Sequence, residues 1–149
     1  MREVNLIVYH CTATKASQDL DVNDIRRMHL KRGWSDIGYH LLIKRDGTIQ
    51  FGRPFEEIGA HVRGFNRKSI GVVWVGGVRE DGRTPEDNRT EEQKKSLKLV
   101  CEFFKLMFPS HDQSEDKPST IRYELSFRLR FYLVINLYDR NEQLQDTST

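Results

Sequence analysis

Cysteine is scarce in this sequence and long hydrophobic runs are missing, and each shortage excludes a class of protein. The 149 residues include only two cysteines, Cys11 and Cys101, which are too few for a disulfide scaffold. No apolar run reaches the roughly 18 residues that cross a bilayer. The N-terminus lacks the basic region, apolar core and small-residue cleavage site of a signal peptide. We therefore expect a protein made in a reducing cytoplasm.

An excess of charge of one sign is also missing. The 24 lysines and arginines nearly balance the 22 acidic residues, which leaves a net charge of +2 and a pI near 8.6. This mildly basic balance suits an anionic polymer but falls short of the basic patch that binds nucleic acid. Because 37% of the residues are hydrophobic and 31% are charged, we expect a globular domain with no nucleic-acid or membrane partner.

The most informative stretch is residues 5–14, an apolar β-branched run that ends in a histidine, a cysteine and a threonine. Such a run predicts a strand that is buried on both faces. A histidine at the end of a buried strand lies at the rim of the sheet, where open α/β sheets place ligands and catalytic groups. His10 is therefore the first candidate site residue. The alternative, a core histidine bonded to a backbone carbonyl, stays open.

Two helices and a hairpin can be placed from local signals. Asn23 is a plausible N-cap for a helix over 24–32, which directs His29 toward the core or a cleft. Thr90 and Gln93 have the spacing of a capping box and open a second helix. Asp-Gly in the middle of 41–53 predicts a tight hairpin between two strands. The apolar run at 69–75 predicts a further strand, central in the sheet.

The sequence changes character after Pro109. Residues 110–120 are polar, and from Tyr123 to Leu137 every odd position is apolar. This alternation runs far past the usual strand length, and the same residues also allow a helix with a broad apolar stripe. We expect one domain over 1–149 with an atypical C-terminal segment from about residue 109.

Histidines gather near the predicted element ends and loops. Four of the five do so, namely His10, His40, His61 and His111. A catalytic zinc ion needs three protein ligands and a water. No pair of residues has the tight HxxxH or CxxC spacing that defines a metal site from sequence alone.

Short blocks that follow one another over residues 5–108 carry a resemblance to a known family. The blocks are His10-Cys-Thr-Ala-Thr14, Met28-His-Leu-Lys-Arg-Gly-Trp34, Asp36-Ile-Gly-Tyr-His40, Lys44-Arg-Asp-Gly-Thr-Ile49, Gly52-Arg53, Gly59-Ala-His61 with Gly64 and Asn66, Ser69-Ile-Gly-Val72 and Val75-Gly-Gly77. In this order they resemble the zinc-dependent N-acetylmuramoyl-L-alanine amidases. That family includes the phage T7 lysozyme type and the peptidoglycan recognition proteins.

The resemblance implies an α/β fold with a mixed central β-sheet flanked by α-helices. It implies a peptidoglycan hydrolase that cleaves the amide between N-acetylmuramic acid and L-alanine with a water activated by Zn2+. Zinc lowers the pKa of a bound water toward about 7 and polarises the carbonyl. The implied partner is peptidoglycan or a muropeptide, bound by a monomer that is made in the bacterial cytoplasm, from a phage or prophage gene, and acts on the cell wall.

The resemblance also assigns roles to single residues. The zinc ligands would be His10 and His111, the catalytic residues Tyr39 and Lys117, and the substrate-binding residues His29, His61 and Asn66. Simpler alternatives stay open, because Tyr39 could be a packed strand aromatic and His40 is better interpreted as a core residue than as a ligand.

The sequence departs from the family after the second helix. Ser119 stands where a cysteine ligand is expected, and Phe108-Pro-Ser110 leads directly into His111, where the family has a strand. A neutral hydroxyl is a poor zinc ligand. A change of reading frame near Phe108 would explain both departures. Two alternatives to the hydrolase follow: a catalytically inactive peptidoglycan-binding module, or a truncated and poorly folded product.

Overall fold

The computed structural model describes residues 2–107, and the statements below concern that part of the chain. The predictions for His111, Lys117 and Ser119, and for the alternating segment 123–137, lie outside the described residues. Within 2–107, no helix is long and apolar enough to cross a bilayer.

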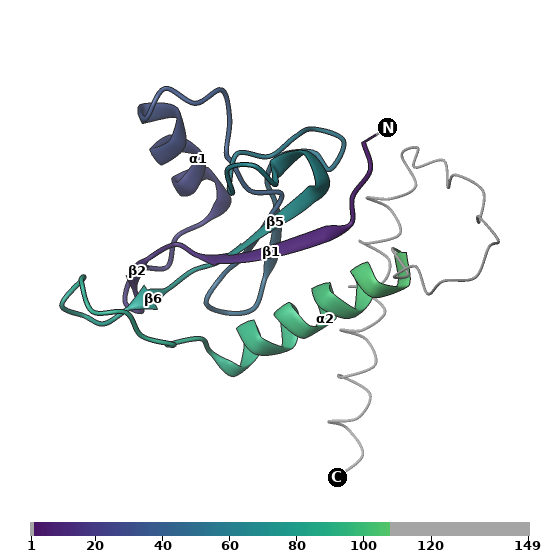
Figure 1. The fold of residues 1–149 in the computed structure, drawn as a ribbon. Helices are drawn as coiled ribbons and strands as arrows, with labels where there is room; N and C mark the ends of the chain where they lie inside the picture. The colour runs from purple at the N-terminus through teal and green to yellow at the C-terminus, as the bar shows by residue number, and fades with distance from the viewer. Residues whose placement is uncertain (1, 108–149) are drawn as a thin grey trace, which may run out of the picture. The chain divides into compact units, whose positions relative to one another are not determined.

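A mixed four-stranded sheet forms the centre of the fold (Figure 1). Its strands, in spatial order, are β1 (Leu6–Cys11), β5 (Ser69–Trp74), β3 (Leu41–Ile43) and β4 (Ile49–Phe51). The first three run parallel, and β4 pairs antiparallel with β3. A second, small parallel pair joins β2 (Thr14–Lys15) to β6 (Gly77–Val78). The mixed sheet expected from the sequence is therefore confirmed.

The positions of β5 and β1 in the sheet explain their different burial. β5 lies between β1 and β3, and its first five residues are buried, as its continuous apolar run predicts. β1 pairs with β5 alone among the described strands, and Leu6 and Tyr9 are 39% and 41% exposed. The expectation that β1 is buried on both faces is therefore wrong, because its second edge gains no neighbour within residues 2–107.

The β3–β4 hairpin forms at the predicted place. Leu41 pairs with Phe51 and Ile43 with Ile49. Gly47 has φ +84°, a conformation that side chains disfavour. The Asp46 carboxylate accepts the Thr48 N–H at 2.9 Å, which closes the turn.

Helix α1 (Val22–Lys31) begins two residues before residue 24, where capping by Asn23 would start it. Asp21 is the N-cap: its carboxylate accepts the Asp24 N–H at 2.8 Å, and the Asp24 carboxylate accepts the Asp21 N–H at 2.9 Å. Both residue types cap helices well, and only the reciprocal bond to the third helical residue distinguishes them. His29 is buried on this helix, as predicted.

The two long helices cover opposite faces of the sheet (Figure 1). Ile25 of α1 packs with Leu42 and Val73 on one face. Because side chains alternate along a strand, Leu41 and Val72, which pair in register, point to the other face. Helix α2 (Glu91–Met107) buries an apolar stripe that includes Phe104 on that side.

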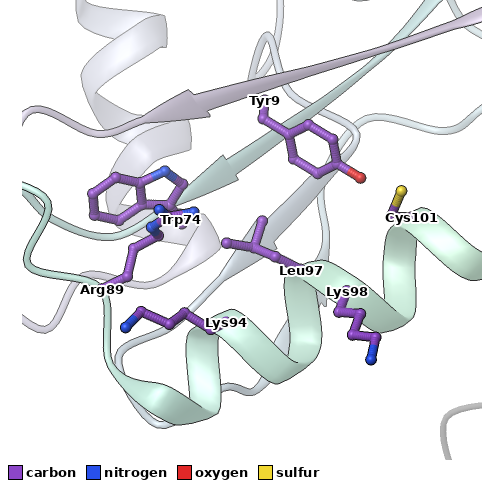
Figure 2. A pocket seen from close by; sticks show the side chains of 7 residues that line it. All are labelled: Tyr9, Trp74, Arg89, Lys94, Leu97, Lys98 and Cys101. Atoms are coloured by element: carbon purple, nitrogen blue, oxygen red, sulfur yellow. The ribbon is translucent and has the colours of Figure 1, made fainter.

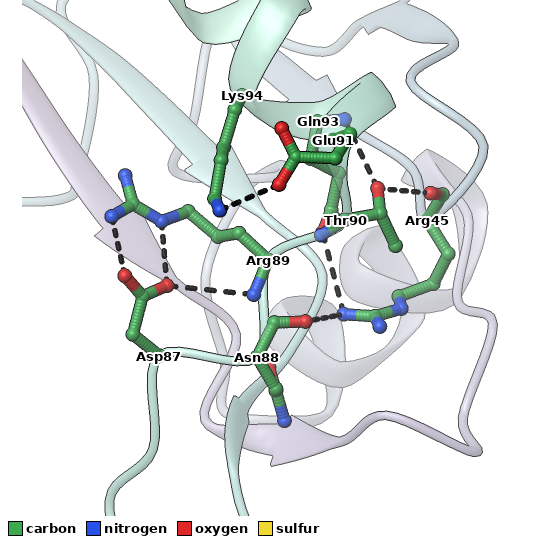
Figure 3. A network of polar contacts seen from close by, with 8 residues as sticks. All are labelled: Arg45, Asp87, Asn88, Arg89, Thr90, Glu91, Gln93 and Lys94. Carbon is green, nitrogen blue, oxygen red and sulfur yellow. Dashed lines mark hydrogen bonds and ion pairs between the residues drawn. The ribbon is translucent and has the colours of Figure 1, made fainter.

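A polar network fixes the start of α2 (Figure 3). The Thr90 hydroxyl accepts the Gln93 N–H at 3.0 Å, and the Gln93 side chain accepts the Thr90 N–H at 3.1 Å, so the predicted capping box is confirmed. The Gln93 amide also donates to the Val75 carbonyl at 2.9 Å. Arg45 donates to the Asn88 carbonyl at 2.7 Å. The helix is thereby tied to the ends of β3 and β5.

Candidate active site

Three of the predicted site residues meet on the face of the sheet that α1 covers in part. The ring centroids of His10 and Tyr39 lie 5.3 Å apart, and those of His10 and His61 lie 5.2 Å apart. His10 comes from β1, Tyr39 from the segment before β3, and His61 from the loop before the short 3₁₀ helix η1 (Asn66–Lys68). Residues distant in the sequence therefore form one cluster.

A glycine on the central strand makes room for this cluster. His10 pairs in register with Val73 and Val8 with Gly71, so all four positions face the same side of the sheet. A Cβ on Gly71 would lie 2.5 Å from Cγ and Cδ2 of His61. The missing side chain therefore lets the His61 ring lie against the backbone of β5, beside His10.

The loop that carries His61 is held by Asn66. The Asn66 Oδ1 accepts the backbone N–H groups of His61 and Val62, both at 2.9 Å. The amide oxygen of Asn66 is therefore used to shape the loop, and its role in binding substrate directly stays a prediction.

Burial keeps the clustered histidines neutral at physiological pH. It lowers the pKa of His10, and it lowers the pKa of His61 to about 4, with the adjacent His10 adding to the effect. A histidine must be neutral to bind a metal ion. Nε2 of His10 lies 3.1 Å from Nδ1 of His61, within hydrogen-bond distance. The pair is thus in a protonation state that suits metal binding.

Tyr39 is half-buried and packs against the core cluster on the α1 side of the sheet. Burial raises the pKa of its phenol, so the hydroxyl is protonated and can donate a hydrogen bond at neutral pH. His29 lies next to Tyr39, with ring centroids 5.5 Å apart, and is only 6% exposed. The Nδ1 of His29 accepts the Gly38 N–H at 2.9 Å. His29 therefore supports the Tyr39 ring, and its contact with substrate stays a prediction.

His40 is a core residue, as the sequence indicated. It is fully buried, its Nδ1 accepts the Gly71 N–H at 3.0 Å, and its Nε2 donates to the Glu57 carbonyl at 3.0 Å. Burial lowers its pKa to about 4. Both ring nitrogens are used inside the fold, so His40 is unsuited to hold a metal ion.

Among the described residues, His10 fits the role of one zinc ligand. His10 is neutral and half-exposed, and its Nδ1 has no hydrogen-bond partner within residues 2–107. In the same part of the chain, no three His, Cys, Asp or Glu side chains gather closely enough to hold a metal ion. A complete site would need ligands from beyond residue 107, where His111 and Lys117, both predicted site residues, lie.

A cavity of about 380 Å³ lies on the opposite face of the sheet, against α2 (Figure 2). Tyr9 lines it, and because neighbouring residues of a strand point to opposite faces, the cavity is separated from His10 by the sheet itself. Its other lining residues are Trp74, Arg89, Lys94, Leu97, Lys98 and Cys101. The three cations are already paired with acidic side chains of their own segments. This cavity is thus independent of the histidine cluster.

Sequence reasoning assigned no role to Ser69. Its hydroxyl donates to the Phe65 carbonyl at 2.8 Å and lies 3.2 Å from Nε2 of His61. The only local signal is a hydroxyl at the head of a buried strand, within the block Ser69-Ile-Gly-Val72. The contact with His61 depends on the loop conformation, which the local sequence does not encode.

Comparison with known proteins gives a consistent set of matches. The family model described as N-acetylmuramoyl-L-alanine amidase matches residues 1–114. The endolysin of Klebsiella phage KP32 is 42% identical over 107 residues, which are 72% of this chain and 70% of that protein. The endolysin of Escherichia phage T7 is 47% identical over 94 residues, 63% of this chain and 62% of that protein.

Solved structures agree with the sequence matches. The N-acetylmuramoyl-L-alanine amidase LysC from Clostridium intestinale superposes with a TM-score of 0.63 at 32% identity, over 72% of this chain and 66% of that chain. The peptidoglycan recognition protein LB of Drosophila superposes with a TM-score of 0.58 at 26% identity, over 72% of this chain and 64% of that chain. A variant of this Drosophila protein has been solved in complex with tracheal cytotoxin.

Proposed function

Because this chain belongs to the N-acetylmuramoyl-L-alanine amidase family, we propose that it hydrolyses peptidoglycan at the amide between N-acetylmuramic acid and L-alanine. In this reaction the amide C–N bond breaks, the hydroxyl of water joins the lactyl carbonyl carbon, and a proton goes to the departing amine. The observation that carries the proposal is the cluster of His10, Tyr39 and His61 on the sheet face, in the family fold.

The described residues can supply binding, orientation and a proton donor to this reaction. His10 would hold zinc, which when bound acts as a Lewis acid that activates water and polarises the carbonyl. The protonated hydroxyl of Tyr39 can donate to the oxygen on which negative charge develops. His61, supported by Asn66, shapes the wall beside His10. His111 and Lys117 are proposed as the second ligand and a further catalytic residue.

Recognition without cleavage is a second candidate function. It is favoured by Ser119, which stands at the position where the family resemblance places a cysteine ligand. The Drosophila recognition protein LE is also similar, at 38% identity over 79 residues. A chain of this kind would bind a muropeptide without hydrolysing it.

Elemental analysis and turnover of a defined muropeptide separate the two functions. The hydrolase predicts one zinc ion per chain and release of L-alanine-terminated peptide, both lost in His10→Ala. The control Lys98→Ala, which changes an exposed side chain on α2, should keep both. Muropeptide binding by a zinc-free, inactive wild type would support the recognition module instead.

A further inference from the structure

Four groups form a chain of contacts that ends at the candidate zinc ligand. The Phe65 carbonyl lies 2.8 Å from the Ser69 hydroxyl, which lies 3.2 Å from Nε2 of His61. Nδ1 of His61 in turn lies 3.1 Å from Nε2 of His10. Ser69 is fully buried and heads the central strand β5.

The carbonyl at the start of this chain decides where each proton lies. A carbonyl oxygen only accepts, so the single proton of the Ser69 hydroxyl points to Phe65, and the hydroxyl oxygen must accept from His61. A neutral imidazole carries one N–H, so His61 is protonated on Nε2 and its Nδ1 is an acceptor. That acceptor requires His10 to donate from Nε2. The remaining nitrogen of His10, Nδ1, then carries the lone pair.

The His61 ring cannot easily avoid this arrangement. It lies directly against the backbone of Gly71, where even a methyl group would come within 2.5 Å of the ring. Rotating the ring by half a turn would place carbon atoms opposite both Ser69 and His10 and would break both contacts. Buried polar groups are rarely left without partners, so the packing and the hydrogen bonds favour the same ring orientation.

We infer that Ser69 is a positioning residue that acts through His61 to hold His10 in the tautomer with a proton on Nε2, leaving Nδ1 as the metal-binding nitrogen. The part that concerns the metal rests on the proposed function, whereas the tautomers themselves do not. Hydrogen bonds to the second nitrogen of a ligating histidine commonly fix its tautomer and tune metal affinity. Ser69 does not contact His10 itself and acts on it through the imidazole of His61.

The test is long-range proton–nitrogen NMR of the imidazole rings in the full, metal-free chain at pH 8. Wild type should show His10 and His61 both protonated on Nε2. In Ser69→Ala the buried Nε2–H of His61 loses its acceptor, so its proton should move to Nδ1 and the proton of His10 should leave Nε2. Ser69→Thr keeps the hydroxyl and should restore the wild-type pattern. His29 and His40 serve as internal controls, because backbone N–H groups fix their Nδ1 atoms as acceptors.

Zinc affinity, measured by competition with a chromophoric chelator, is the second readout. Ser69→Ala should weaken zinc binding about tenfold, the lower end of the range for residues that hydrogen-bond to a metal ligand. Ser69→Thr should leave zinc binding unchanged. A proton on Nδ1 of His61 in the wild type overturns the inference, as do unchanged tautomers in a folded Ser69→Ala. A wild type that binds no zinc would contradict the proposed hydrolase, and the tautomers would still decide the role of Ser69.

Discussion

The phenol of Tyr39 is the described group best placed to donate a proton or hydrogen bond near His10. Burial raises its pKa, and it lies on the same sheet face as His10 and His61. Tyr39→Phe should therefore fold and bind muropeptide while kcat falls about 100- to 1000-fold, the usual loss when one oxyanion donor is removed. Turnover of a defined muropeptide, with KM and kcat measured separately, checks this.

Tyr9→Phe is the matched control for that substitution. Tyr9 lines the cavity on the opposite face of the sheet, so loss of its hydroxyl should leave kcat unchanged (Figure 2). If Tyr39→Phe kept full activity while His10→Ala abolished it, Tyr39 would be a packing residue and its catalytic role would be refuted.

The buried histidines predict how stability depends on pH. Burial lowers the pKa of His40 to about 4, below the value of 6.5 in an unfolded chain. Between these values the unfolded chain binds the proton more readily, so stability is complete above pH 6.5 and falls as the pH approaches 4. The free energy of unfolding should decrease by up to about 1.4 kcal/mol per pH unit from His40. His61 contributes a smaller decrease in the free energy of unfolding, because it is less buried and solvent screens its charge more.

Urea denaturation at pH values from 7 to 4.5 measures this slope. Asp87 is exposed, and its partner Arg89 lowers its pKa to about 2. Its titration in the folded chain therefore lies below this pH range and does not contribute to the slope. A free energy of unfolding that stayed constant between pH 7 and 5 would show that His40 is not held neutral in the fold.

At the scale of elements, one glutamine links the start of α2 to the sheet. Gln93 is fully buried, closes the capping box with Thr90 and donates to the Val75 carbonyl (Figure 3). Gln93→Ala removes the acceptor of the part-buried Thr90 N–H and the shorter of two hydrogen bonds to the Val75 carbonyl, and we expect it to lower the free energy of unfolding by about 2 kcal/mol. Chemical denaturation of both chains measures the difference.

Lys98→Ala is the control on the same helix. The Lys98 side chain is 77% exposed and its ion pair with Glu102 is long, 3.9 Å, so its removal should change stability by less than about 0.5 kcal/mol. Equal effects of the two substitutions would mean that the polar network at the start of α2 contributes little to the fold.

The elements that the sequence predicted well are those with local causes. Asp-Gly in the hairpin and the Thr90–Gln93 spacing each determine structure within a few residues, and both are confirmed. The N-cap of α1 was assigned to Asn23 instead of Asp21 because two good capping residues lie close together. Each local signal is reliable for the type of element and less so for its first residue.

The candidate site was predictable only in part, because its contacts join residues that are far apart in the sequence. His10 could be placed at the end of a strand, but its contact with His61 joins residues 51 positions apart. That contact needs the missing side chain at Gly71 and the loop bonds of Asn66. Neither produces a periodic or turn signal in the sequence. Ser69 was missed because its role depends on this tertiary contact.

At the scale of the whole molecule, the proposed hydrolase requires residues beyond 107 to complete the zinc site. The family resemblance implies His111 as a ligand and Lys117, six residues later, as a catalytic residue, and it leaves Ser119 where a thiolate is expected. If this segment belongs to the same site, His111→Ala should remove zinc as completely as His10→Ala does. Elemental analysis of the three purified chains compares them directly.

Ser119→Cys tests, by a gain of zinc affinity, whether this segment belongs to the zinc site. A thiolate is a far better zinc ligand than a neutral hydroxyl. The substitution should therefore tighten zinc binding by about tenfold or more, because even residues that only hydrogen-bond to a metal ligand change affinity on that scale. Ser114→Cys adds a thiol to the same segment off the expected spacing and should have no such effect. Equal zinc affinity in Ser119→Cys, Ser114→Cys and wild type would mean that this segment does not reach His10. A change of reading frame near Phe108 would then be the better explanation, and the gene should encode a histidine-containing strand and a Lys-x-Cys sequence in another frame downstream.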